Sequence, residues 1–130
     1  GPQAVVISID VCLTSIGYEV FVNCGKTPTG VKVENWARKA TNCGAGELLI
    51  NSIDRDGQGN GFELPLYATV TEATSLPIIG CGGCGSYQHV KDLIKLPGVN
   101  AAAAGNLFNF TELSYPEMKR ELREDGLSVR

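Results

Sequence analysis

The sequence predicts an α/β fold in which four parallel strands alternate with four helices in a single domain over residues 1–130. Three observations support this prediction: short apolar runs recur along the chain, segments with helical spacing follow them, and glycine or polar residues mark the junctions. A repeated strand–helix order with short connections requires parallel strands joined by right-handed crossovers. A chain of 130 residues is also long enough to bury one core.

Each expected strand is an apolar run that ends at a polar or glycine-rich exit. This pattern is typical of strands that are buried on both faces. Asp10 closes the first strand, and Tyr18–Asn23 is expected to form an excursion in a loop or hairpin before the first helix. The expected strands are Ala4–Ile9, Glu47–Asn51, Leu76–Cys81 and Val99–Ala104.

The expected helices have recognisable start and stop signals. Gly44 ends the first helix, Ser86 is expected to cap the N-terminus of the third, and Pro116 suits the first turn of the fourth. The expected helices are Glu34–Asn42, Leu64–Ala73, Tyr87–Lys95 and a last one from Tyr115 or Pro116 to Glu124.

The composition argues against several classes of function. With a net charge of −3 and no block of like charges, the chain lacks the positive face that sequence-independent nucleic-acid binding needs. The apolar runs Ala4–Ile9 and Ala101–Ala104 are far shorter than a membrane span of about 20 residues. The start Gly1–Gln3 lacks the charged region of a signal peptide, so we expect a cytoplasmic location.

The chain contains five cysteines, whose odd number and spacing do not form a secreted disulfide framework. This also favours a reducing cytosol. Cys81 and Cys84 form a CxxC, but no second CxxC or histidine pair completes four zinc ligands. His89 is the only histidine and lies in an expected helix. We therefore expect no metal and no cofactor.

Polar residues collect at the C-terminal ends of the expected strands, where ligands bind in barrels and open α/β sheets. Asp10 suits general acid–base work there, or it caps the next segment or pairs with a lysine. Asn51 is a natural polar contact in a barrel mouth. The loop Asp54-Arg55-Asp56 either orders a substrate or supplies an acid, or it is an internally bonded loop in which Arg55 neutralises its neighbours.

The segment Gly80–Gly85, followed by Ser86 and a helix, is the clearest ligand motif. Glycines allow backbone N–H groups to approach a phosphate, and the next helix adds its N-terminal dipole. A second glycine exit, Gly105-Asn106, follows one strand later, as in the phosphate site after the last two strands of many (βα)8 barrels. The other interpretation is that these glycines only form tight turns, but phosphate binding is the favoured prediction.

Several segments resemble the C-terminal half of the HisF family, the cyclase subunits of imidazole glycerol phosphate synthases. The resemblance follows the chain in order over essentially its whole length, and Ser-Ile-Asp-Arg-Asp-Gly is a specific motif. It implies a (βα)4 half of a TIM (βα)8 barrel. The segments that carry it are Gln3–Val6, Ser8–Asp10, Gly44–Glu47, Asn51–Gly57, Gly82–Gly83, Leu107–Phe110 and the ending Glu117–Arg130.

The resemblance implies a cyclase of histidine biosynthesis that takes ammonia from a separate glutaminase subunit and uses it to split and cyclise a phosphorylated ribonucleotide. In the family one aspartate from each half-barrel does the acid–base chemistry, and Asp10 matches the aspartate of this half. Glu47 matches one member of a charged ring at the ammonia entrance. The positions that match a phosphate site or a ligand-bordering loop are Asp56, Gly57, Gly82, Gly83, Gly105 and Asn106.

The chain departs from the family pattern at several positions. Val11–Leu13 stands where the family has a lysine, Asn51 where threonine is common, and Cys81 and Asn106 where serines are common. Asn51, Cys81 and the run Ala103–Gly105 resemble HisF-like paralogs of surface-polysaccharide pathways, in which a similar barrel pairs with a glutaminase and an amidotransferase. These departures make an amidotransfer system an alternative.

The N-terminal half of such a barrel, with its own aspartate and phosphate site, is not in the sequence. A lone half-barrel exposes two sheet edges and a broad apolar face, which two copies related by a two-fold axis would cover. We therefore expect a homodimer or a higher oligomer. Three functions stay open: a phosphate-binding half-barrel with little or no turnover, a cyclase or amidotransfer partner completed by a second copy or a separate N-terminal half, and a non-catalytic assembly module.

Overall fold

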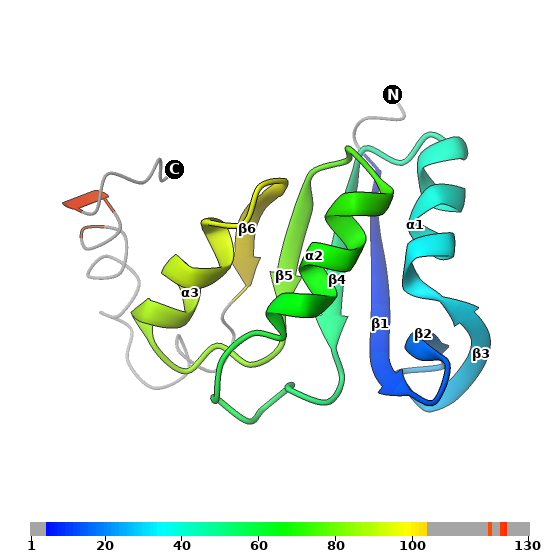
Figure 1. Ribbon diagram of the computed structural model, residues 1–130, viewed down its shortest axis with the longest axis horizontal. Coiled ribbons are helices and arrows are strands. Elements are labelled where there is room, and N and C mark those ends of the chain that lie inside the picture. Colours follow the sequence, from blue (N-terminus) through cyan, green and yellow to red (C-terminus); the bar gives the residue numbers. More distant parts are fainter. Residues whose placement is uncertain (1–4, 104–119, 121–122, 125–130) are drawn as a thin grey trace.

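The computed structural model describes residues 5–103, 120 and 123–124, which contain a six-stranded sheet and three helices (Figure 1). The strand order is β3-β2-β1-β4-β5-β6. Strands β1, β4, β5 and β6 run parallel, and β1, β2 and β3 pair antiparallel. The strands are β1 (Val6–Thr14), β2 (Gly17–Val22), β3 (Thr27–Lys32), β4 (Glu47–Ser52), β5 (Ile78–Cys81) and β6 (Val99–Ala103).

The prediction of an α/β half-barrel with parallel strands is confirmed by this sheet, and the excursion after the first strand is the hairpin β2–β3. The helices α1 (Val33–Asn42), α2 (Leu64–Ala73) and α3 (Tyr87–Ile94) lie where the sequence predicted the first three helices. Ser86 caps α3, since its side chain accepts a hydrogen bond from His89 N at 3.3 Å. The predicted fourth helix, Gly105 and Asn106 lie outside the described residues, apart from Arg120, Arg123 and Glu124 of that helix.

The prediction that Asp10 closes the first strand is wrong, because β1 continues to Thr14. Residues Asp10–Thr14 pair with β2, with Asp10 opposite Phe21 and Thr14 opposite Gly17. On its other side, β1 pairs with β4 from Val6 to Val11. Asp10 therefore lies in the middle of a continuous strand, at the point where the hairpin begins to pair.

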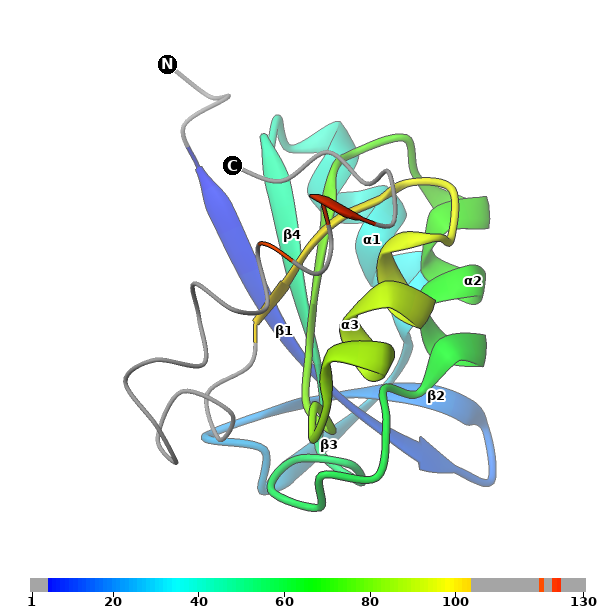
Figure 2. The ribbon, with the colours of Figure 1, turned by 90° about the vertical axis from the view of Figure 1, so that its left-hand side faces the viewer.

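The three helices cover one face of the sheet, as Figure 2 shows from the side. The side chains that point toward them form the core, because successive side chains of a strand point to opposite faces. Ile9, Leu48, Ile50 and Ile78 are at most 2% exposed. The helices add Val33, Ala37, Leu66, Tyr67, Val70 and Leu93 to this core.

The opposite face of the four parallel strands, here called the inner face, carries the alternate residues. It consists of Val6, Ser8 and Asp10 on β1, Glu47, Leu49 and Asn51 on β4, Ile79 and Cys81 on β5, and Ala101 and Ala103 on β6. All of these residues are half-buried or exposed, whereas their neighbours on the strands β1 and β4 that face the helices are mostly buried. The inner face is apolar toward the middle of the strands and polar at their C-terminal ends.

Within the described part of the chain, the longest helices have 10 residues. None of them is long and apolar enough to cross a membrane.

Candidate functional site

Two residues predicted for the site, Asp10 and Asn51, lie in one row across the parallel strands. Asp10 is level with Asn51, Asn51 is level with Cys81, and Cys81 is level with Ala103. Residues in register on parallel strands point to the same face, so this row crosses the inner face near the C-terminal ends of the strands. The predicted edge of the sheet therefore brings Asp10 and Asn51 together.

Asn51 holds Asp10 through its amide group. Its Nδ2 donates a hydrogen bond to Asp10 Oδ1 at 3.1 Å. Asn51 Oδ1 is buried and has no hydrogen-bond partner among the described residues. It lies beside Gly82, because a Cβ placed on Gly82 would be 2.9 Å from this oxygen. An unsatisfied acceptor beside a carboxylate is a site that a ligand hydroxyl or N–H group can fill.

The thiol of Cys81 is affected by its burial and by two carboxylates, those of Asp56 and Asp10. Burial raises the pKa of the Cys81 thiol, the carboxylate of Asp56 raises it further, and that of Asp10 adds a smaller effect, while a bond from the Gly82 backbone opposes them. The thiol thus remains a neutral hydrogen-bond donor at physiological pH. The exposed Asp56 carboxylate has no polar partner among the described residues, so it is available to a ligand.

The glycine loop, residues Gly82–Gly85, packs backbone against backbone on the loop between β4 and α2. A Cβ on Gly83 would lie 2.1 Å from Gly61 O, and a Cβ on Gly85 would lie 2.1 Å from Gly59 O. Gly61 N donates to Gly83 O at 2.8 Å. Close packing therefore accounts for part of this glycine pattern, independently of any ligand. The N–H of Gly83 has no acceptor in the described chain, which leaves it available to an anion.

His89 fixes the far end of the glycine loop. Its Nδ1 accepts a hydrogen bond from Gly85 N at 3.0 Å, and its backbone N–H is capped by Ser86. Since Nδ1 accepts, the neutral ring carries its proton on Nε2. His89 therefore has a structural contact that the sequence did not reveal, and Gly85 N is not available to a ligand.

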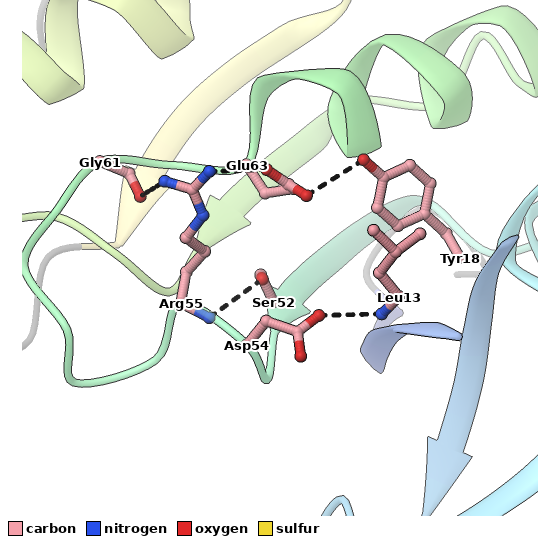
Figure 3. A network of polar contacts seen from close by, with 7 residues as sticks. All are labelled: Leu13, Tyr18, Ser52, Asp54, Arg55, Gly61 and Glu63. Atoms are coloured by element: carbon pink, nitrogen blue, oxygen red, sulfur yellow. Dashed lines mark hydrogen bonds and ion pairs between the residues drawn. The ribbon is translucent and has the colours of Figure 1, made fainter. Parts of the chain in front are cut away.

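The loop after β4 sends two adjacent charged side chains in opposite directions, as Figure 3 shows. Asp54 accepts from Leu13 N at 2.8 Å and from Cys12 Sγ at 3.1 Å. Arg55 donates to Gly61 O at 3.3 Å and to Glu63 Oε1 at 2.9 Å. The interpretation that Arg55 neutralises its neighbours Asp54 and Asp56 is wrong, because its ion pair is with Glu63.

Glu63 continues this network to the hairpin. Its second oxygen, Oε2, accepts from the hydroxyl of Tyr18 on β2 at 3.1 Å. Burial raises the pKa of Tyr18, and the Glu63 carboxylate raises it further, so the phenol stays protonated and can donate. Neither residue was predicted from the sequence, because no local motif indicates that a hairpin tyrosine meets the residue before α2.

Tyr67 was also missed, because its apolar neighbours on α2 suggested only a core residue. It is fully buried, and its hydroxyl donates to Cys81 O at 2.8 Å or to Ile50 O at 3.1 Å. The same hydroxyl accepts from Cys81 N at 3.1 Å. Tyr67 thereby fixes the backbone of Cys81 at the start of the glycine loop, and burial raises its pKa strongly.

The remaining predicted positions are separated from this edge or open to solvent. Glu47 lies level with Val6 at the N-terminal end of β4, so it is on the inner face but at the opposite edge from Asp10. Gly57 is exposed with a φ of +77°, and a Cβ placed on it would meet nothing within 4 Å, which fits a loop that borders open space. All five cysteines are free, and the described residues contain no cluster of three metal-ligating side chains.

Residues 1–114 match the family model described as "Histidine biosynthesis protein". The chain belongs to this family. Over its full length it is 42% identical to the imidazole glycerol phosphate synthase subunit HisF of Clostridium botulinum (strain Okra / Type B1). It is 39% identical to the HisF subunit of Oceanobacillus iheyensis. The resemblance to HisF in the sequence is thus confirmed.

The chain spans about half the length of these curated relatives, 52% of the first and 51% of the second. This share fits the four parallel strands of the sheet, which are half of the eight in a complete (βα)8 barrel. The histidine biosynthesis family membership and the partial barrel therefore agree.

Proposed function

We propose that this chain supplies the C-terminal half of a HisF-like cyclase site and binds a phosphorylated small molecule at the C-terminal edge of its parallel sheet. The observation that carries the proposal is the row of Asp10, Asn51 and Cys81 beside Gly82. A carboxylate held by an amide, next to a loop of glycines, offers proton transfer and anion binding in one place.

In this proposal each site residue has a separate role. Asp10 exchanges protons with the reacting ligand, and the Asn51 amide orients the Asp10 carboxylate. Asn51 Oδ1, which has no partner among the described residues, accepts a hydrogen bond from the ligand. Asp56 and Gly57 border the ligand from the β4–α2 loop. The phosphate lies against Gly82 and Gly83, and Gly105 and Asn106 complete its site. Glu47 belongs to an ammonia entrance at the other edge, next to a glutaminase subunit.

The proposed activity of the isolated chain is weak or absent, because only one half of the barrel's acid–base pair is present. The inner face gives the reason to expect a partner: Val6 is 47% exposed there, and Leu49 and Ile79 are only half-buried. We propose that a second copy of the chain covers this face in a homodimer, which would place two Asp10 carboxylates at one mouth. Light scattering at micromolar concentration tests this, and a compact monomer would contradict it.

The second candidate function is a partner in surface-polysaccharide amidotransfer. Asn51 favours it, because its Oδ1 offers an acceptor that the threonine common in HisF would not place in the same way. In this second candidate function the phosphate site is the same as in the HisF-like cyclase proposal, but the contacts with the sugar part of the ligand differ. A non-catalytic, self-assembling half-barrel is the third candidate, and it is favoured if changes at Asp10 and the glycine loop have no effect on function.

Two measurements test the proposed function. First, inorganic phosphate is titrated into the ¹⁵N-labelled chain at constant ionic strength, with sodium chloride as the control. We expect shifts confined to the amides of Gly82, Gly83 and Cys84. Second, ammonia-dependent product formation is measured for the chain alone and mixed with an N-terminal half-barrel, with Asp10→Asn as the matched variant.

The expected second result is turnover that depends on the mixture and disappears in Asp10→Asn. Asn keeps the size of Asp10 and can still accept from Asn51, so the variant should fold. Phosphate shifts spread evenly over the surface would reject the phosphate site. Turnover that survives Asp10→Asn would reject the assignment of acid–base chemistry to this residue.

A further inference from the structure

We propose that Arg55 is a positioning residue that holds the glycine loop Gly82–Gly85 in the conformation used for anion binding, without contacting the ligand itself. The inference rests on the proposed phosphate site at this loop. It concerns a chain of contacts that runs from Tyr18 of the hairpin through Glu63 and Arg55 to Gly61, as Figure 3 shows. From Gly61 the chain continues to Gly83.

The guanidinium of Arg55 donates hydrogen bonds to two different acceptors. Nη1 donates to Gly61 O at 3.3 Å, and Nη2 forms the ion pair with Glu63 Oε1 at 2.9 Å. The side chain of Arg55 is 32% exposed and that of Glu63 is 15% exposed, so the pair is only partly screened by water. A planar fork can serve two acceptors in fixed directions, which a lysine ammonium on a flexible stem cannot do equally well.

Gly61 transmits this contact to the glycine loop. While its carbonyl is held by Arg55, its N–H donates to Gly83 O at 2.8 Å. The chain contains no cis peptide bond among the described residues, and in a trans peptide the C=O and the next N–H point in opposite directions. The bond to Gly83 O therefore turns the N–H of Cys84 away from the β4–α2 loop.

The side chain of Arg55 also packs directly against this loop. A Cβ on Gly83 would lie 3.1 Å from Arg55 Cβ and 2.1 Å from Gly61 O. Gly83 has a φ of +109°, a conformation that residues with a side chain rarely adopt. The loop is thus held in a demanding backbone conformation from the side on which Arg55 and Gly61 lie.

Glu63 connects the Arg55 guanidinium to the β2–β3 hairpin. One carboxylate oxygen binds Arg55 and the other accepts from Tyr18 on β2. A carboxylate shared by two donors has its position fixed on both sides, so Glu63 restricts the rotamer of Arg55. Protein acceptors already engage one N–H of Nη1 and one of Nη2, two of the five N–H donors of Arg55, so we assign this residue the role of orienting the backbone.

Arg55→Lys tests the proposal in the full 130-residue chain, with Arg38→Lys as the matched control. Arg38 is an exposed arginine on α1 that donates only to Asn35, at 2.8 Å, within the described chain. Three quantities are measured for each variant: the hydrogen-exchange rate of the Gly61 amide without ligand, the Kd for inorganic phosphate by NMR titration, and the Tm. Glu63→Gln is a second variant that keeps Arg55 and weakens its ion pair.

We expect Arg55→Lys to speed exchange of the Gly61 amide and to weaken phosphate binding, each by about tenfold, as the loss of one charge-assisted hydrogen bond implies. Its Tm should fall by no more than Glu63→Gln lowers it, and Arg38→Lys should change neither exchange nor affinity. Unchanged exchange of the Gly61 amide in Arg55→Lys would overturn the proposal. If phosphate binding nevertheless weakened in that variant, Arg55 would contact the ligand directly.

The test separates this inference from the proposed function. If the unmodified chain fails to bind phosphate, the phosphate site is rejected, and the role of Arg55 in preparing that site is rejected with it. If the unmodified chain binds phosphate and Arg55→Lys binds it equally well, only the positioning role of Arg55 is rejected.

Discussion

The hydroxyl of Tyr67 lies 2.8 Å from the carbonyl oxygen of Cys81 and 3.1 Å from its amide nitrogen. One side chain from α2 thus satisfies both backbone groups of the residue that ends β5. Since β5 ends at Cys81, the residues that follow it have no pairing with a neighbouring strand to hold them. The start of the glycine loop is therefore fixed from the core.

Tyr67→Phe should destabilise the chain by about 1–3 kcal/mol, because it leaves buried backbone groups of Cys81 unsatisfied while keeping the ring. The measurement is urea unfolding followed by circular dichroism. Tyr18→Phe is the control, since Tyr18 loses one bond to the partly exposed Glu63, and its cost should be under about 1 kcal/mol. Equal costs for the two variants would show that the Cys81 contact has no special weight.

Gly83→Ala should cost more stability than Gly57→Ala. Both glycines have positive φ, +109° and +77°, so both variants incur the conformational cost of roughly 1–2 kcal/mol. Only at Gly83 would the new Cβ meet a backbone oxygen, Gly61 O, at 2.1 Å. We expect an additional loss of about 1–3 kcal/mol there, as for overpacked cores, measured by urea unfolding.

This pair of variants also affects how phosphate binding can be tested. A change at Gly83 that abolishes binding does not show that Gly83 contacts phosphate, because the clash with Gly61 disturbs the loop first. Similar stability for Gly83→Ala and Gly57→Ala would contradict the close packing of the two loops.

The thiol of Cys12 should react slowly at mildly alkaline pH. Burial and the Asp54 carboxylate raise its pKa from 9.0 to about 11. Because the neutral thiol is favoured in the folded state, the stability it contributes is complete below pH 9.0 and is lost as the pH rises toward about 11. Alkylation by iodoacetamide, followed by mass spectrometry between pH 8 and pH 10 with the exposed Cys24 as an internal reference, measures this difference.

Asp54→Asn should make Cys12 more reactive without restoring the behaviour of an exposed thiol, since burial is the larger cause of its raised pKa. The amide keeps an oxygen that can accept from Leu13 N. If Cys12 reacts as fast as Cys24 in the unmodified chain at pH 8.5, the contact between Cys12 and Asp54 does not protect the thiol.

If two copies pair through the inner face as proposed, Leu49→Lys should yield a folded monomer. Leu49 lies on the inner face and is half-buried, so a charge there opposes a second copy without entering the core. Leu48→Lys is the control, because Leu48 points to the helices and is 0% exposed; a lysine there should unfold the chain. Light scattering and circular dichroism distinguish these results, and an unchanged oligomer in Leu49→Lys would contradict pairing through the inner face.

The sequence was sufficient to predict the parallel strands and the first three helices, because their signals are local. The apolar run of Glu47–Asn51 and the cap at Ser86 need no distant partner to be recognised. The end of β1 was predicted wrongly, because its second half is a strand only through pairing with β2. Leu13 and Thr14 carry no strand signal of their own strong enough to override the turn residues nearby.

The same distinction holds for the candidate site. Asp10, Asn51 and the glycine loop were assigned to one edge because each was expected at the end of an apolar run, and parallel strands bring their C-terminal ends together. The structure does place Asp10 level with Asn51, although both residues lie within strands. The partners of Asp54 and Arg55 were not found, because each contact joins elements whose spacing in the sequence is unrelated to their distance in the fold. Arg55 is next to two acids in the sequence, yet it binds a third one eight residues away.

One side of strand β1 is paired along only part of its length. From Asp10 to Thr14 that side is occupied by β2, whereas for Val6–Ile9 the described chain provides a neighbour only on the other side, β4. The unpaired stretch Val6–Ile9, to which a strand of another half-barrel could pair, is therefore four residues long, or about 13 Å at the rise of a β-strand. A strand added there cannot slide past Asp10 without meeting the hairpin, so the hairpin acts as a stop that sets the register of any closed barrel.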